Sequence, residues 1–421
     1  MSLGIYISVP FCRSKCSYCN FASGVFSPAQ MGRYVDRLCC DIVSSRPLAA
    51  QLGCRVPGPV DSVYLGGGTP SLLPEAELKK LFSAIAGEFD LAPDAEITVE
   101  CAPATLTEPV LDALVACGVN RVSLGVQSFV DQEAASVARL HTRQKTLGDI
   151  ECLRRHGIDN INVDLIAGLP HQTRESWAFS LAQAALTGVP HVSVYMLEVD
   201  EDSRLGRELI AGGNRYHAHF VPDDEATAEF YETARAQLAA NRIDQYEISN
   251  FARTGSESRH NLKYWTRQPY LGFGVDAHSM LPVSEEGVAR EIESMRLAAT
   301  DSFENFFTDA EVKAQEVTFD EALEESLFLG LRLNRGINVD ALTARFGKRF
   351  QEYVPIIAEL VTDRMLAATG DLLQLTPRGR LLSNDVFEKF ILGYKDKGYK
   401  DKDPEDKNLE DTDLRNTKVP A

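Results

Sequence analysis

Three cysteines near the start of the chain have the residue type and the spacing of a metal-binding loop. Cys12, Cys16 and Cys19 lie together in the run CRSKCSYC. A structural zinc site uses four protein ligands, and iron–sulfur clusters are usually held by four cysteines. Three thiolates therefore leave one metal position open for a substrate or a cofactor. The sequence predicts a reactive metal centre in this loop.

Other roles of cysteine do not fit the triplet. The chain has 9 cysteines, an odd number, and no secretory signal precedes the loop, so a disulfide framework is not expected. The remaining cysteines have no common spacing and are expected to be small buried hydrophobic residues: Cys39, Cys40, Cys54, Cys101, Cys117 and Cys152. The triplet differs because it follows the apolar run at 5–9. It begins where a buried strand ends, which is where α/β folds place their sites.

Glycines and polar residues stand at the ends of other predicted strands. The second strand runs into GGGTP at 66–70, where the backbone can approach a ligand and offer its own N–H and C=O groups. Each polar residue alone could be a hydrogen-bonded core residue or a helix cap. Several at one edge of a sheet indicate a common polar site, because buried polar groups need partners. These residues are Glu100, Gln127, Arg139 and Asp164.

The elements that position these residues alternate between strands and helices. Strands are predicted at 5–9, 62–65, 96–100, 121–127, 162–167 and 191–197. Helical patterns lie between them at 74–88, 106–117, 145–156 and 174–186. Six βα units predict a parallel sheet, which is either doubly wound or a partial barrel. No Gly-x-Gly-x-x-Gly follows the first strand, so the doubly wound dinucleotide-binding sheet loses its best support.

The rest of the chain is expected to form a smaller, mainly helical region. A helix is predicted at 223–240, a short strand at 246–249 and a loop rich in glycine and aromatic residues at 260–278. A largely helical segment at 320–369, a strand at 372–375 and a helix at 377–388 are typical of a winged-helix-like module. The chain beyond about residue 393 is charged and is expected to be disordered.

Composition limits the partners and the compartment. With 43 basic and 61 acidic residues the net charge is -18, which disfavours binding to nucleic acid or to anionic lipid. No apolar stretch approaches the length of a membrane span, and no signal or transit peptide fits ahead of the first strand. We expect a cytoplasmic protein in a reducing compartment, with no nucleic acid and no integral membrane segment among its features.

Four motifs together resemble the radical S-adenosylmethionine (SAM) superfamily. They are the cysteine loop, GGGTP, GVQSF and NVDLIAGLP. The branch that they resemble contains the oxygen-independent coproporphyrinogen III oxidases and their relatives. The resemblance implies an α/β fold, a partial (β/α)6 TIM-like barrel, with a 4Fe-4S cluster on Cys12, Cys16 and Cys19 and with SAM on the open iron. It also implies a division into a barrel at 1–220, an extension at 221–300, a C-terminal helical domain at 301–392 and a tail at 393–421.

The same resemblance implies which residues contact SAM. Arg139 suits the SAM carboxylate and Asp164 suits the ribose, whereas Glu100 could meet either the ammonium group or the ribose. The glycine loop can bind the ammonium group through its carbonyls. The matched positions are Tyr6, Gly67, Gly68, Thr69, Glu100, Gln127, Arg139 and Asp164.

Two departures separate this chain from the oxidases. Those enzymes resemble one another in a fourth cysteine two residues after the third, and this chain has Phe21 at that position. Five residues precede Tyr6, too few for the oxidases' N-terminal segment. In contrast, the run HNLKYW at 260–265 matches the His-Asn-x-x-Tyr-Trp motif of the HemW-type haem chaperones. The resemblance is therefore strongest to that subgroup.

The subgroup implies a protein that binds a 4Fe-4S cluster, SAM and haem, and passes haem to acceptor haem proteins, respiratory ones among them. His260 offers an imidazole to the iron, and Tyr264 and Trp265 offer flat faces to the porphyrin; Asn261 completes the motif. The runner-up is an oxygen-independent coproporphyrinogen III oxidase, which decarboxylates propionate side chains by radical chemistry. Whether SAM is cleaved, which electron donor reduces the cluster and whether the chain forms a homodimer stay open.

Overall fold

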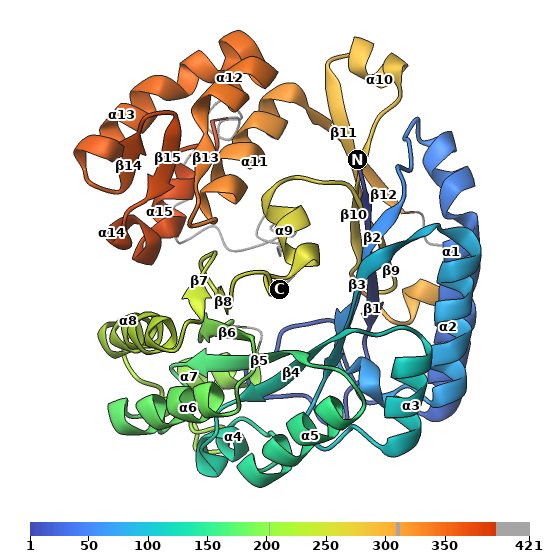
Figure 1. Ribbon diagram of the computed structural model, residues 1–421, viewed down its shortest axis with the longest axis vertical. Helices are drawn as coiled ribbons and strands as arrows, with labels where there is room; N and C mark the ends of the chain where they lie inside the picture. The colour runs from blue at the N-terminus through green and yellow to red at the C-terminus, as the bar shows by residue number, and fades with distance from the viewer. Residues whose placement is uncertain (202, 309–311, 393–421) are drawn as a thin grey trace.

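The computed structural model describes residues 1–201, 203–308 and 312–392, so the predicted tail at 393–421 lies outside the described residues. Within these ranges the strands form one sheet of twelve and one sheet of three. Figure 1 shows the large sheet as an open curve, with helices on its outer side and the C-terminal elements beside its gap. This architecture confirms the α/β fold with a partial barrel. No helix in the described ranges is long and apolar enough to cross a bilayer.

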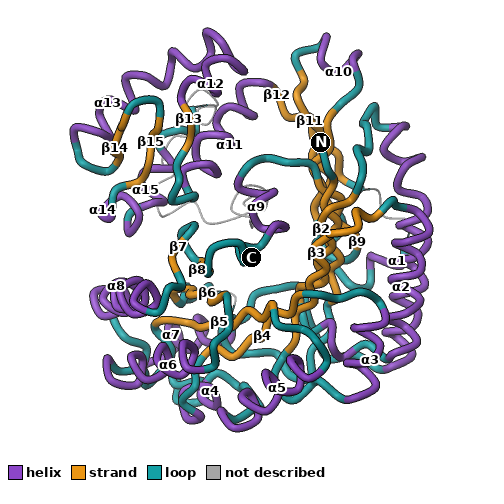
Figure 2. Tube along the Cα trace, viewed as in Figure 1, coloured by secondary structure: helices purple, strands orange, loops and turns teal. Residues whose placement is uncertain are grey.

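The six predicted strands form the parallel part of the large sheet. Each pairs with the next in sequence: β1 (Leu3–Val9), β2 (Val60–Gly67), β3 (Leu91–Cys101), β4 (Arg121–Gln127), β5 (Asn160–Ala167) and β6 (His191–Met196). Figure 2 shows the intervening helices outside the curve: α1 (Pro28–Gln51), α2 (Glu75–Glu88), α3 (Glu108–Ala116), α4 (Asp131–Ser136), α5 (Arg143–Arg155) and α6 (Arg174–Leu186). Because the carboxyl ends of parallel strands share one edge, the barrel has a defined mouth.

Later elements extend the sheet at both ends. Beside β6, helices α7 (Arg204–Ala211) and α8 (Asp224–Ala240) precede β7 (Asp244–Gln245) and β8 (Asn250–Ala252). Beside β1 the added strands are β9 (Tyr270–Phe273), β10 (His278–Pro282), β11 (Ile292–Ala298) and β12 (Lys313–Thr318), with α10 (Glu285–Ala289) between β10 and β11. Because β9 pairs in parallel with β1, a late segment is the direct neighbour of the strand that leads to the cysteine loop.

The structure corrects two predictions between β7 and β9. Residues 246–249, predicted as a strand, form the turn between β7 and β8, because Glu247 accepts hydrogen bonds from Ser249 N (2.9 Å) and Asn250 Nδ2 (2.6 Å). The predicted loop at 260–278 contains β9 and the helix α9 (Arg259–Trp265), which lies on the inner side of the curve in Figure 1. Glu96 of β3 accepts hydrogen bonds from two backbone N–H groups at the start of α9, both at 3.1 Å. A carboxylate stabilises a helix N-terminus in this way.

The C-terminal elements have an apolar core of their own. It contains Leu323, Leu327, Phe346 and Leu373, and one acidic side chain of this region, Glu325, forms ion pairs to two arginines near the large sheet. The helices are α11 (Phe319–Leu331), α12 (Val339–Phe346), α13 (Val354–Thr362), α14 (Pro377–Leu381) and α15 (Ser383–Glu388). The three antiparallel strands are β13 (Ile337–Asn338), β14 (Leu366–Thr369) and β15 (Leu372–Leu375). Short 3₁₀ helices lie at η1 (Pro70–Leu72), η2 (Ala218–Phe220), η3 (Asn305–Phe307) and η4 (Gly347–Tyr353).

Candidate functional site at the barrel mouth

The glycine loop after β2 holds the start of the cysteine loop after β1. Gly68 N donates to Val9 O (3.0 Å), and Thr69 N donates to Phe11 O (2.7 Å). Thr69 Oγ1 donates a weak hydrogen bond to Cys12 Sγ at 3.9 Å. A Cβ atom at Gly68 would lie only 2.7 Å from Val9 O, so only glycine fits at this crossing. The two loops are therefore positioned by each other.

The three cysteines supply thiol ligands of the kind that hold an iron–sulfur cluster. All three are free thiols on one partly buried loop. Burial raises the pKa of Cys12, and Cys19 and Cys16 add a smaller electrostatic effect in the same direction. No three His, Cys, Asp or Glu side chains in the described ranges are arranged to hold one ion. A 4Fe-4S cluster needs a wider arrangement because each thiolate binds its own iron. Cluster binding must also release the thiol protons.

Glu100, at the end of β3, lies beside the glycine loop. Its Oε1 accepts a hydrogen bond from Tyr64 OH (2.9 Å), and its Oε2 accepts one from Gly67 N (3.2 Å). Burial, followed by the nearby Asp164 carboxylate, raises the pKa of Glu100 to about 8. Tyr6 OH lies 3.4 Å from the position that a Cβ of Gly67 would take, so the tyrosine ring borders the same loop. A cationic group bound here would stabilise the charged form of Glu100.

Gln127 and Arg139 each carry a buried polar atom that has no hydrogen-bond partner among the described residues. Gln127, at the end of β4, has a φ of 69° and an unpartnered Oε1. Arg139 Nη2 donates to Tyr18 OH (3.3 Å), whereas its Nε has no partner. Burial acts to lower the pKa of Arg139, but Tyr18 and Cys16 raise it above its usual value, so the guanidinium stays charged. Unpartnered buried atoms are costly, so both side chains fit a polar ligand at this point.

Asp164 belongs to a polar network inside the curve of the sheet. Asn162 Nδ2 donates to Asp164 Oδ1 (2.7 Å) and to Ser193 Oγ (3.0 Å). Ser193 Oγ donates to Asn250 Oδ1 (2.7 Å), and Asn250 Nδ2 donates to Glu247 Oε1 (2.6 Å). Burial raises the pKa of Asp164, and hydrogen bonds from its neighbours oppose that rise. The sequence analysis did not predict these partners, although residues 162 and 164 share one face of a strand.

The predicted haem motif lies on α9, on the inner side of the curved sheet. Nδ1 of His260 is 3.0 Å from Ser62 Oγ, and Nε2 is 2.8 Å from Tyr264 OH. The imidazole is 1% exposed, and burial lowers its pKa to about 3. Tyr64, the partner of Glu100, has its ring centroid 5.4 Å from that of His260, and Tyr6 of the predicted SAM set has its centroid 6.4 Å away, so the motif lies directly beside that set. Coordination of iron by His260 requires one of its two hydrogen bonds to break.

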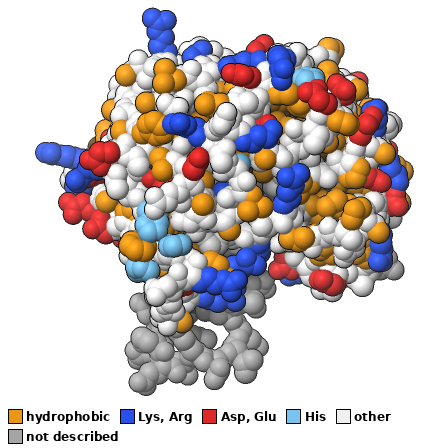
Figure 3. All heavy atoms as spheres, turned by 90° about the horizontal axis from the view of Figure 1, so that it is seen from below, with side chains coloured by type: hydrophobic (Ala, Val, Ile, Leu, Met, Phe, Trp, Pro, Cys, Tyr) orange, Lys and Arg blue, Asp and Glu red, His pale blue; other side chains and the backbone are white. Residues whose placement is uncertain are grey.

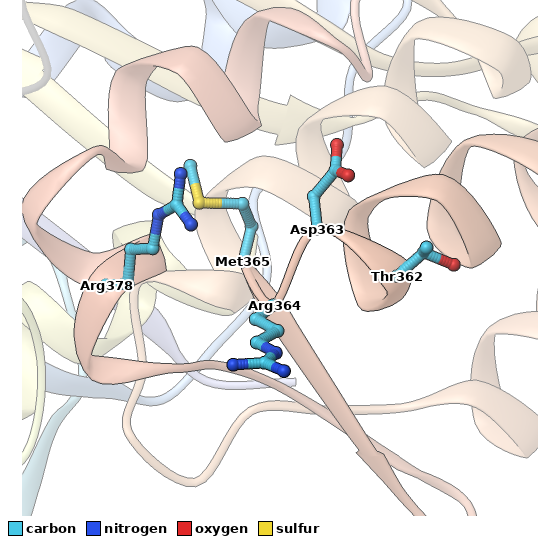
Figure 4. Close-up of a pocket in the computed structure, with 5 residues that line it drawn as sticks. All are labelled: Thr362, Asp363, Arg364, Met365 and Arg378. Atoms are coloured by element: carbon cyan, nitrogen blue, oxygen red, sulfur yellow. The ribbon is translucent and has the colours of Figure 1, made fainter.

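A hollow in the C-terminal region contains none of the predicted site residues. Its volume is about 500 Å³, and it is lined by Thr362, Asp363, Arg364, Met365 and Arg378. Figure 4 shows the guanidinium groups of Arg364 and Arg378 directed to different places, so they do not converge on an anion. We therefore assign no function to this hollow.

Comparison with known proteins places this geometry in a class. Residues 6–182 match the radical SAM superfamily, and residues 317–382 match the HemN C-terminal domain. The structure of coproporphyrinogen III oxidase (HemN) from Escherichia coli has a TM-score of 0.77 at 23% identity, and the likeness covers 92% of this chain and 90% of that chain. That likeness shows the fold. The chain is a member of the radical SAM superfamily, and membership implies a 4Fe-4S cluster and SAM.

Sequence similarity to two relatives shows which family of the radical SAM superfamily the chain belongs to. The heme chaperone HemW of Bacillus subtilis is 33% identical over 92% of this chain and 98% of its own length. The mitochondrial radical S-adenosyl methionine domain-containing protein 1 of Bos taurus is 32% identical over 90% of this chain and 81% of its own length. The chain belongs to the HemW haem chaperone family, which confirms the resemblance carried by the sequence motifs.

Proposed function

We propose that this protein is a haem chaperone, which binds haem and passes it to acceptor haem proteins, respiratory ones among them. The similarity to the heme chaperone HemW of Bacillus subtilis over 98% of that protein's length carries the proposal. Free thiols at every described cysteine are in keeping with a cytoplasmic location. The proposal includes an electron donor that reduces the cluster. A measurement of the oligomeric state decides between a monomer and a homodimer.

The barrel mouth is proposed as the site of the two resident cofactors. Cys12, Cys16 and Cys19 would hold the 4Fe-4S cluster, and together the cluster and SAM supply one-electron chemistry when bound. The unpartnered Nε of Arg139 suits the SAM carboxylate, and the unpartnered Oε1 of Gln127 suits its ammonium group. The full proposed SAM set is Tyr6, Gly67, Gly68, Thr69, Glu100, Gln127, Arg139 and Asp164.

Haem is proposed to bind at the motif on α9, formed by His260, Asn261, Tyr264 and Trp265. Asn261 Oδ1 and Trp265 Nε1 are buried and have no hydrogen-bond partner within the described residues, which supports a polar ligand nearby. Because His260 Nε2 is hydrogen-bonded to Tyr264, we expect haem ligation here to be slow and to displace the tyrosine hydroxyl.

The coproporphyrinogen oxidase activity is not favoured by any observation on the described residues. The likeness to HemN at 23% identity shows the fold alone. The oxidases resemble one another in a fourth cysteine, and this chain has Phe21 at that position, 43% exposed. We propose haem transfer as the function and test decarboxylation beside it.

Anaerobically reconstituted protein tests the proposal. Haem-loaded protein is mixed with an apo b-type haem protein, and transfer is followed by the Soret band of the acceptor. The same preparation is incubated with SAM, a reductant and coproporphyrinogen III. We expect haem transfer and no protoporphyrinogen. Failure to bind or transfer haem, or clear formation of protoporphyrinogen, overturns the proposal. Cys16→Ala serves as the control for iron and sulfide content.

A further inference from the structure

Three histidines and a phenylalanine form a cluster on the surface, outside the site described above. His171 Nε2 lies 3.2 Å from His217 Nδ1. The ring of Phe220 contacts the rings of both His171 and His219, with centroids 4.1 Å apart in each pair. Figure 3 shows histidine side chains gathered beside hydrophobic atoms on one face of the molecule. We call His171, His217, His219 and Phe220 the histidine cluster.

An open cavity with both apolar and polar walls lies next to the histidine cluster. Its volume is about 390 Å³, which falls within the usual range for small-molecule sites. Nearby, Leu209 is 54% exposed and Phe220 is 47% exposed, so the cavity continues onto apolar surface. A flat hydrophobic ligand larger than the cavity could therefore extend over this surface. The residues that line the cavity include Leu197, Val199, Leu209, His219, Val221 and Asp224.

A buried carboxylate fixes the loop that carries two of the histidines. Glu208 of α7 accepts hydrogen bonds from the backbone N–H groups of Arg215, Tyr216 and Ala218, at 2.8 to 3.2 Å. Burial acts to raise the pKa of Glu208, but these bonds lower it below its usual value. The loop at 212–219 is therefore held in one conformation before any ligand arrives, which reduces the entropy lost on binding.

The histidine cluster stands at the same edge of the barrel as the cysteine loop. Leu205 N of α7 donates to Ser17 O (2.8 Å) in that loop. Leu197, which lines the cavity, also packs on the small apolar cluster that Tyr18 of the cysteine loop contacts. A ligand in the cavity and the cysteine loop would thus both adjoin this small apolar cluster.

We propose that the histidine cluster is a haem-docking site, in which the porphyrin lies in the cavity and His219 ligates the iron. Histidine is a common axial ligand of haem iron, and apolar walls suit the macrocycle. Asp224 on the cavity wall would repel the propionates, so they are expected to point away from it toward solvent. The proposal rests on the proposed function for the identity of the ligand. Because His219 is exposed and His260 is 1% exposed, the histidine cluster is the site that haem meets first.

Parallel titrations test the proposal. Ferric haem and iron-free protoporphyrin IX are titrated into wild type, His219→Ala, Leu209→Asp and His260→Ala. We expect His219→Ala to weaken haem affinity by about tenfold or more and to shift the Soret band, with no effect on the iron-free porphyrin. Leu209→Asp should weaken both ligands. His156→Gln, a substitution outside every proposed site, should change neither titration.

The outcomes separate this proposal from the proposed function. If wild type binds haem and His219→Ala has the wild-type affinity and Soret spectrum, the docking site is overturned while the chaperone function stands. The same holds if His219→Ala weakens haem and iron-free porphyrin equally, since ligation is then not involved. If wild type binds no haem, both proposals fall. Urea denaturation of each variant confirms that the protein is folded.

Discussion

The crossing of the glycine loop and the cysteine loop makes Gly68→Ala a sharp test of the site. The new Cβ would lie 2.7 Å from Val9 O, 2.8 Å from Phe11 O and 2.9 Å from Phe11 N, all of them backbone atoms that cannot rotate away. Overpacking of this kind costs about 1–3 kcal/mol. Separation of the loops would also weaken the Gly68–Val9 and Thr69–Phe11 hydrogen bonds, at about 0.5–1.5 kcal/mol each. We expect a total loss of about 2–6 kcal/mol in the free energy of unfolding.

Gly148→Ala is the matched control, because it makes the same chemical change at an exposed position within α5, where a Cβ meets nothing within 4 Å. There the substitution should stabilise the protein by about 0.5–1 kcal/mol, since alanine favours helix. Urea denaturation gives both free energies, and iron content after anaerobic reconstitution should fall for Gly68→Ala alone. Wild-type stability and iron content in Gly68→Ala would refute the packing account of the glycine loop.

Three further predictions concern the barrel mouth and helix α9. The pKa of Glu100 is raised from 4.5 to about 8, so between these pH values the folded SAM-free protein binds more protons than the unfolded chain. Its free energy of unfolding should therefore fall as pH rises through that window. In urea denaturation, Glu100→Gln should show a smaller dependence of this free energy on pH. Glu96→Ala should cost about 1–3 kcal/mol in the same assay by removing acceptors at the start of α9, whereas Asp94→Ala, at an exposed ion pair, should cost under about 1 kcal/mol. Arg139→Lys should weaken SAM binding to the reconstituted protein in equilibrium dialysis, and exposed Arg155→Lys should not.

The strand ends could be predicted from the sequence because each parallel strand is a continuous apolar run. The second and third runs stop at a glycine and at Glu100, the fourth ends at Gln127, and the fifth carries Asp164, so polar residues in and after these runs indicate where the barrel mouth lies. The partners of Asp164 were not predicted, because a hydrogen bond between neighbouring strands depends on register. Register follows from the pairing of β4, β5 and β6, which local patterns do not contain.

The two wrong predictions have a common cause: in each, a glutamate side chain accepts hydrogen bonds from backbone N–H groups. Helix α9 begins where Glu96 accepts its N–H groups, and Glu96 lies 163 residues from Arg259 in the chain. The turn at 246–249 forms because the Glu247 side chain takes the N–H that a strand would need. The histidine cluster could not be predicted from local patterns either, because His171 and His217 are 46 residues apart in the sequence and come together only in the fold.

The parallel pairing of β1 with β9 sets an order of events during synthesis. Gly4 to Ile7 pair with Tyr270 to Phe273, so the strand that carries the cysteine loop has only one neighbour until residue 273 has been made. At about 5–20 residues per second, the ribosome needs roughly 13–50 seconds to cover that distance. During this interval the three thiols follow a strand that is still at the edge of the sheet. Loading with iron and sulfide is therefore expected to follow translation, when the completed sheet can hold the loop in place.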